Sequence, residues 1–384
     1  MAEQRQAAQI PNLLSLRGSR TSRGRGRGHG SPNLRSPEES REVTESVKDK
    51  IVQQTDQDAS DSRMSAVSLG YLEDDFAAAF SNGPVNRRYP IINRGTYART
   101  TAIDRLVDKF LSTYPKEPKQ IISLGAGSDT RYFRLVTSHP DIQLLYHELD
   151  FADNTRSKIN TIKNSPLLLK TISSHTDVDS IQISADGTTL TSPTYNIHAL
   201  DLRDLAKDEN IPNLPNLSKT TPTLLLSECC LIYLPPSSTI FILRTLTQTL
   251  LPQPTPLSLI LYEPINPHDA FGQVMIQNLL QRGIHLQTLH AYSSLSLQKQ
   301  RLKDAGFTGG QEAADVDFIY ERWIGKGERD RVGRCEFLDE IEEWRLLARH
   351  YCVAWGWRDG VGGEGGVFGK AWGDVEGQDD GGGG

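Results

Sequence analysis

Residues 121–130 read IISLGAGSDT, and this stretch decides the fold. Four residues of a buried type, 121–124, are followed by two glycines one residue apart, which predicts a strand that ends in a tight turn. Because glycine has no Cβ, the backbone of such a turn can pass close to a ligand. In an open α/β sheet, ligands bind at the carboxyl ends of the strands, so we expect the functional site here.

Four further strands are predicted along the chain, at residues 144–149, 195–200, 223–227 and 257–262. One helix face is visible before the first strand, in the apolar spacing of Ile103, Leu106, Val107, Phe110 and Leu111. Further helices are expected from about residue 130, at 268–281, 294–305 and 336–348, before a last apolar segment at 351–355. Strands that alternate with helices imply right-handed crossovers. The predicted fold class is therefore α/β, with a doubly wound, mainly parallel sheet.

The two ends of the chain differ in composition from the middle. Residues 1–60 contain the Arg/Gly tract Arg23–Gly28 and show no apolar periodicity, so a disordered tail is predicted there. Residues 357–384 are rich in glycine and acidic residues, and a second disordered tail is expected. The folded domain should then span residues 61–356. An Arg/Gly tract can also contact RNA, and this alternative to a solvated tail stays open.

Charge and composition argue against several classes of protein. A net charge of -6 disfavours a chain whose whole surface binds nucleic acid or membrane. The four cysteines include no CxxC pair, so reduced, buried thiols are expected rather than disulfides or a metal site. No secretory signal opens the chain, and the longest apolar run, residues 223–234, is too short to span a bilayer. We expect a soluble cytoplasmic monomer without a membrane partner.

Three acidic residues, Asp150, Asp201 and Glu228, stand at successive strand ends. A dinucleotide site would favour G-x-G-x-x-G, but the third glycine position is Thr130. Without that glycine to pack over a pyrophosphate, acids at successive strand ends favour a nucleoside that lacks phosphates. The acid after the second strand could accept both ribose hydroxyls. S-adenosylmethionine fits that description. Taken singly, Asp201 and Glu228 could equally be a helix cap and a surface acid.

Six short motifs resemble those of the leucine carboxyl methyltransferases and occur in the same order. They are YPIINRGTYAR at 89–99, LGAGSDT at 124–130, ELDF at 148–151, LSECCLIY at 226–233, FGQVM at 271–275 and LDE at 338–340. The resemblance covers residues 63–356. It implies a class I S-adenosylmethionine-dependent methyltransferase fold, Rossmann-like, with helical N-terminal and inserted lid elements. It also implies that the substrate is the C-terminal leucine α-carboxylate of the protein phosphatase 2A catalytic subunit.

Carried over residue by residue, the resemblance implies cofactor contacts at Arg63, Arg99, Gly125, Asp150, Asp201, Leu202 and Glu228. Arg99 would hold the methionine carboxylate of the cofactor by charge-assisted hydrogen bonds, with help from Arg63. At position 63 the family leads us to expect lysine, and arginine keeps the charge but changes the geometry. Arg99 is also the first candidate for a catalytic role.

The remaining roles follow from the same resemblance. Asp150 would accept the ribose hydroxyls, and Asp201 would bond the exocyclic amine of adenine while Leu202 packs against the ring. Glu228 would lie near the ammonium or sulfonium end of the cofactor. Tyr233 is the second catalytic candidate and would receive the substrate carboxylate.

The chemistry needs little acid–base help, because a peptide C-terminal carboxyl group has a pKa of about 3.3–3.7 and is already an anion at neutral pH. Two related alternatives remain: a family branch that methylates a modified guanosine of transfer RNA, and carboxyl methylation of a small molecule. A third alternative, of another class, is a non-catalytic RNA-associated protein that uses Arg23–Gly28. Residues 182–194 and 211–222 read as long loops that could alter substrate docking.

Overall fold

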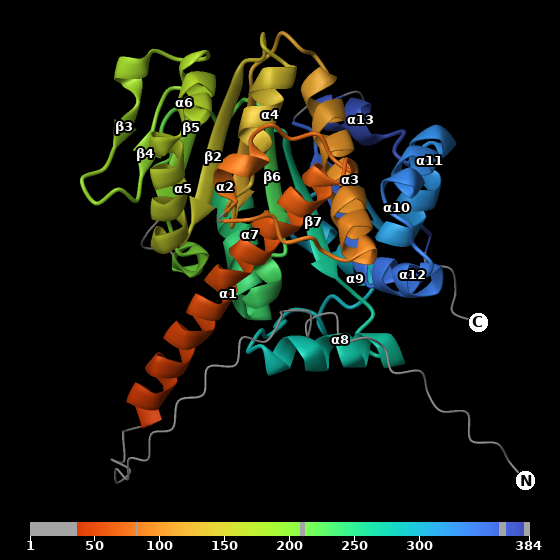
Figure 1. Cartoon of the computed structure of the whole chain (residues 1–384). Helices are drawn as coiled ribbons and strands as arrows, with labels where there is room; N and C mark the ends of the chain where they lie inside the picture. Colours follow the sequence, from red (N-terminus) through yellow and green to blue (C-terminus); the bar gives the residue numbers. More distant parts are fainter. Residues whose placement is uncertain (1–36, 82, 208–211, 361–365, 380–384) are drawn as a thin grey trace, which may run out of the picture.

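The computed structural model describes residues 37–81, 83–207, 212–360 and 366–379 (Figure 1). Within these residues one sheet of nine strands has the order β3-β4-β5-β2-β1-β6-β7-β9-β8. The parallel strands are β1 (Lys119–Leu124), β2 (Leu144–Asp150), β5 (Tyr195–Ala199), β6 (Thr223–Glu228) and β7 (Leu257–Pro264). Antiparallel strands complete the two edges: β3 (Gln182–Ile183) and β4 (Leu190–Thr191) beside β5, and β9 (Tyr351–Arg358) and β8 (Gly310–Asp315) beside β7.

The strand order reverses at β1. From there the chain adds β2 and β5 on one side, and then returns to add β6 and β7 on the other. Leu124 at the end of β1 is in register with Leu149 of β2 and Ser227 of β6, so the carboxyl ends of the three strands meet. The predicted doubly wound, mainly parallel α/β fold is confirmed, and its switch point coincides with the glycine turn.

Helices cover both faces of the sheet, because successive side chains of a buried strand point to opposite sides. Ile121 packs into one core and Ile122 into the other. The helices are α1 (Pro37–Ser68), α2 (Ala77–Phe80), α3 (Pro90–Ser112), α4 (Arg131–Ser138), α5 (Ala152–Asn164), α6 (Pro166–Ser173), α7 (Pro236–Arg244), α8 (Ala270–Gln281), α9 (Leu295–Asp304), α10 (Val316–Arg322), α11 (Lys326–Cys335), α12 (Ile341–Arg349) and α13 (Val367–Trp372). Helices α3 to α6 and α10 to α13 contribute to the Ile121 core, while α7 and α9 contribute to the other.

The prediction of a disordered tail through residue 60 is wrong for residues 37–60, which belong to α1. The N-terminal turns of α1 project from the domain, and its C-terminal part packs against α3 (Figure 1). The buried side chains of α1 are small: Ser60, Ser65 and Ala66. Its attachment depends on polar contacts, so a search for an apolar stripe misses it. The Arg/Gly tract lies outside the described residues.

The prediction of a disordered tail from residue 357 is also wrong. Strand β9 continues to Arg358, and α13 follows at Val367–Trp372. Phe368 stacks on Phe110 of α3 with ring centroids 4.8 Å apart, and Trp372 donates a 2.9 Å hydrogen bond from Nε1 to the Leu106 carbonyl. Phe368 and Trp372 therefore anchor this glycine-rich segment, together with the buried Val367, Ala371 and Val375.

Smaller differences concern loops and thiols. Residues 182–194 contain the β3–β4 hairpin, whereas residues 212–222 form neither helix nor strand, as predicted for that segment. The helix expected at 336–348 begins only at Ile341. Of the four thiols, only Cys352 is fully buried. No helix in the described part of the chain is long and apolar enough to cross a membrane.

Candidate active site

A cavity of about 430 Å³ lies at the carboxyl ends of β1, β2, β5 and β6. Helices α1, α3 and α12 complete its wall. The structure brings all of the predicted site residues into this one lining: Arg63, Arg99, Gly125, Asp150, Asp201, Leu202, Glu228 and Tyr233. Their individual roles stay predictions.

The glycine turn leaves β1 with a left-handed backbone, φ +64° at Gly125 and +46° at Gly127. A Cβ at Gly125 would lie 2.5 Å from Sγ of Cys230, so no side chain fits there. Asp150 holds the turn from the next strand, since its Oδ2 accepts a 2.7 Å hydrogen bond from the Gly127 amide. The other oxygen accepts from the Phe151 amide at 2.7 Å. Asp150 therefore fixes the turn, in addition to the ligand role predicted for it.

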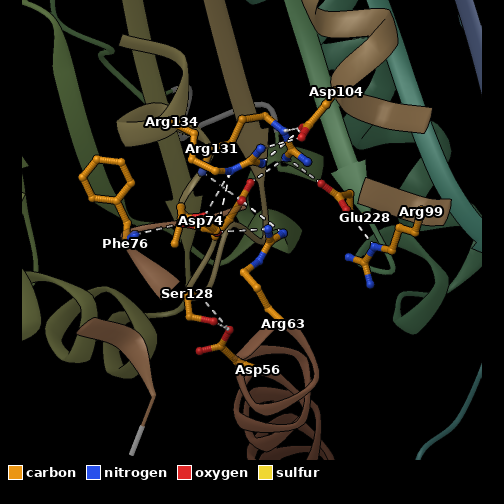
Figure 2. A network of polar contacts seen from close by, with 12 residues as sticks. Asp56, Arg63, Asp74, Phe76, Arg99, Asp104, Ser128, Arg131, Arg134 and Glu228 are labelled. Atoms are coloured by element: carbon orange, nitrogen blue, oxygen red, sulfur yellow. Dashed lines mark hydrogen bonds and ion pairs between the residues drawn. The ribbon is translucent and has the colours of Figure 1, made fainter. Parts of the chain in front are cut away.

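Glu228, at the end of β6, lies between two arginines (Figure 2). Its Oε2 accepts from Nε of Arg99 at 2.8 Å, and its Oε1 accepts from Nη1 of Arg131 at 2.6 Å. Burial alone would raise the pKa of Glu228, but these two guanidinium groups hold it below the usual range. Glu228 is therefore neither a helix cap nor an isolated surface acid, and it is ionised at neutral pH.

Arg131 begins α4, directly after the glycine turn, and its side chain has no solvent exposure. Besides Glu228 it binds Asp129 at 2.6 Å and Asp104 of α3 at 3.2 Å. These charge-assisted contacts fix β6, the turn and α3 relative to one another. The sequence analysis missed Arg131, although it follows the quoted motif by a single position.

Arg63 reaches the same network from α1 (Figure 2). Its Nη1 donates to Oδ2 of Asp74 at 3.3 Å, and its Nη2 lies 3.9 Å from Asp129. Asp74 in turn accepts a 2.6 Å hydrogen bond from Thr130. Arg63 thus has structural partners as well as a place in the cavity lining.

Asp201 caps the short helix Leu202–Ala206 by accepting from the Arg203 amide at 2.9 Å. The Arg203 guanidinium also binds this carboxylate, at 2.6 Å, and reaches Asp49 of α1 at 2.7 Å. The helix-cap role kept open for Asp201 is therefore real. The Asp201 carboxylate would therefore have to bind both Arg203 and the predicted amine of adenine. Leu202, the predicted packing partner of the adenine ring, is buried in the cavity wall.

Aromatic side chains form the wall near Arg99. The Arg99 guanidinium carbon lies 4.7 Å from the ring centroid of Tyr262, and Tyr262 stacks on Tyr351 with centroids 5.5 Å apart. Tyr233 lines the cavity, and burial raises the pKa of its hydroxyl group, which is neutral at pH 7. Glu263, the acid that follows Tyr262, is turned away and binds Arg301 at 2.7 Å. An acid at a strand end is thus not always a site residue.

The chemistry of this lining fits S-adenosylmethionine. Asp150 and Asp201 supply acceptors for hydroxyl and amine groups, Arg99 supplies donors for a carboxylate, and Gly125 leaves room for a close approach. Among the described residues no cluster of His, Cys, Asp and Glu could hold a metal ion. A glycine turn at the switch point of this sheet, followed by an acid at the next strand end, is a nucleoside-binding arrangement. With this lining it fits the class of S-adenosylmethionine-dependent methyltransferases.

The chain belongs to the leucine carboxyl methyltransferase family, whose family model matches residues 38–247. A relative from Emericella nidulans named Leucine carboxyl methyltransferase 1 is 51% identical and covers 97% of this chain and 98% of its own. The protein of the same name from Aspergillus fumigatus is 50% identical, with 97% and 99% covered. That from Rattus norvegicus is 36% identical, with 81% and 91% covered.

Solved methyltransferase structures also align with the chain. The plantazolicin methyltransferase BamL, in complex with a triazolic desmethylPZN analog and SAH, aligns at a TM-score of 0.41 and 12% identity. The alignment covers 80% of this chain and 98% of that one. Carboxyl methylation with S-adenosylmethionine rests on the family match and on the relatives named above, and this alignment adds no argument to it.

Proposed function

We propose that the protein methylates the C-terminal leucine α-carboxylate of the protein phosphatase 2A catalytic subunit. The observation that carries this proposal is the match to the leucine carboxyl methyltransferases, and the state of Arg99 supports it. Among the described residues its hydrogen bonds come only from Nε, and in Figure 2 its terminal nitrogens point away from Glu228. Arg99 is thus held in place by one nitrogen and has the others to offer to a carboxylate.

The reaction asks the protein to align two groups and to exclude water. When bound, S-adenosylmethionine supplies an electrophilic methyl group on its sulfonium. Arg99 has the donors to hold the methionine carboxylate of the cofactor, and Tyr233 stands in the same lining to receive the substrate carboxylate. Tyr262 and Tyr351 add aromatic surface to this wall, which would help to keep water from the reacting groups. No general base is required, because the substrate carboxylate is ionised at neutral pH. Alignment of this kind can supply roughly 7–11 kcal/mol of the barrier reduction.

The proposal is tested by incubating the full chain with methyl-labelled S-adenosylmethionine and the phosphatase catalytic subunit. We expect the label on the intact subunit, none on a subunit lacking its final leucine, and release of the label by mild alkali, which cleaves methyl esters. Arg99→Ala should nearly abolish transfer, with Arg105→Ala on the same helix as the matched control.

Three outcomes would contradict the proposal. Equal labelling of the subunit without its leucine would exclude this carboxylate as the acceptor. A label that survives alkali would exclude an ester altogether. Labelling of transfer RNA, with none on the phosphatase, would instead support the branch of the family that acts on a modified guanosine.

A further inference from the structure

Helix α1 forms part of the cavity wall over several turns. Its lining residues are Asp49, Val52, Gln53, Thr55, Asp56, Asp58, Ala59, Ser62 and Arg63. The carboxylate of Asp56 reaches the glycine turn, where its Oδ1 accepts from both the amide and the hydroxyl of Ser128 at 2.7 Å (Figure 2). A segment far from the sheet in sequence thus completes the turn that begins the cofactor site.

The contact between Asp56 and the turn is closely fitted. A Cβ at Gly127 would lie 2.2 Å from Oδ1 of Asp56, so glycine at this position makes room for the carboxylate. Two consecutive amides are therefore held by two carboxylates, Gly127 by Asp150 and Ser128 by Asp56. Burial raises the pKa of Asp150, and the nearby charge of Asp56 adds to that increase. Two acids are kept close together at the cost of their repulsion.

Other contacts of α1 reach neighbouring segments. Asp49 binds Arg203, which holds the Asp201 carboxylate of the cavity lining, and Asp58 forms an ion pair with Arg282 at the end of α8. Between Asp49 and Ala59 no side chain of α1 is fully buried. This part of the helix is held by polar contacts to the glycine turn, to Arg203 and to Arg282, and each such contact between partly exposed groups is individually weak.

We propose that α1 is a structural part of the cofactor site and that Asp56 is a positioning residue, which holds the glycine turn in its cofactor-binding shape. Asp56 acts through the Ser128 amide and hydroxyl, while α1 closes the cavity over the bound nucleoside. Release of the cofactor then requires these polar contacts to break. The proposal concerns cofactor binding and does not depend on the identity of the methyl acceptor.

The test measures the binding of S-adenosylhomocysteine to the full chain by calorimetry and stopped-flow. Asp56→Ala should raise the Kd by about tenfold or more, which corresponds to about 1.4 kcal/mol, mainly through faster dissociation. Asp56→Asn should recover much of the affinity, because its amide oxygen can still accept from Ser128. The matched control is Asp61→Asn on the same helix, which loses an ion pair with Arg88 outside the cavity lining and should bind as the wild type does.

Hydrogen exchange at a saturating concentration of S-adenosylhomocysteine gives a second readout, independent of affinity. S-adenosylhomocysteine should slow the exchange of amides 49–63 in the wild type, and this protection should be lost in Asp56→Ala. A folded Asp56→Ala protein with wild-type Kd and dissociation rate would overturn the proposal. So would tighter binding in that variant, which would show that the carboxylate competes with the cofactor, or an equal loss in Asp61→Asn.

Discussion

Arg131, at the start of α4 and with no solvent exposure of its side chain, donates a 2.6 Å hydrogen bond to Glu228 at the end of β6. The same guanidinium group also binds Asp104 and Asp129. One cation thus neutralises carboxylates from α3, from the glycine turn and from β6. The site depends on this arrangement before any ligand enters.

Arg131→Met should destabilise the protein strongly. Methionine fills a similar volume, but the variant leaves carboxylates without their buried partner, which costs about 3–5 kcal/mol. Urea denaturation of the variant measures this loss. The control is Arg156→Met, which removes a surface pair with Asp153 whose side chains are 44% and 70% exposed, and should change stability by about 0.5 kcal/mol or less. Equal effects in the two variants would contradict a central role for Arg131.

Asp150→Ala should weaken binding of S-adenosylhomocysteine about tenfold or more. The substitution removes the acceptor of the Gly127 amide together with the acceptor predicted for the ribose, each worth about 1.5–3 kcal/mol before relaxation. Calorimetry on the purified variant gives the change in Kd. Asp153→Ala, three residues further on in α5, is the control and should bind normally. Unchanged affinity in a folded Asp150→Ala protein would remove this residue from the site, and tight binding of NADH would contradict the cofactor assignment.

Stability should fall between pH 6.5 and 4 because of a histidine pair on β2 and β5. Nδ1 of His147 lies 3.0 Å from Nε2 of His198. Burial and the neighbouring His198 lower the pKa of His147 to about 3, and burial lowers the pKa of His198 to about 4. In the unfolded chain each histidine has a pKa near 6.5, so the unfolded state takes up protons first as the pH falls. The free energy of unfolding therefore has its full value above pH 6.5. Below that pH it falls by about 1.4 kcal/mol per pH unit for His147.

Chemical denaturation at pH 7, 6 and 5 measures this dependence. His147→Gln should show a shallower slope than the wild type in that window, whatever its absolute stability. His139→Gln, at the end of α4, is the control and should keep the wild-type slope. An unchanged slope in His147→Gln would mean that other groups take up the protons.

Trp372→Ala should cost about 3–5 kcal/mol of stability, as for other large aromatic residues truncated in a core. The side chain is only 1% exposed and donates to a backbone carbonyl of α3. A thermal melt compares the variant with Asp379→Asn, an exposed position near the same end, which should be neutral. A loss below about 1 kcal/mol would restore the sequence-based view that this segment does not pack.

The sequence by itself determined the sheet and the place of the site. The side chains of an apolar run such as residues 121–124 alternate between the two faces of a strand, so the run is stable where both faces are buried. The glycines after it determine where the strand turns. Since parallel strands end at a common edge, Asp150 and Glu228 had to lie close to that turn. These inferences need only local periodicity and the geometry of a parallel sheet.

Only the tertiary structure decided which polar groups pair and which segments dock. Glu228 and Glu263 both stand at the ends of apolar strands. Glu228 lines the cavity between two arginines, whereas Glu263 binds Arg301 of α9. Asp56 and Trp372 lie in segments whose composition is that of a disordered tail. Each is held by a few contacts with residues far away in the sequence, to Ser128 and to the Leu106 carbonyl. Such pairings depend on distances across the fold, and composition and local periodicity carry no record of them.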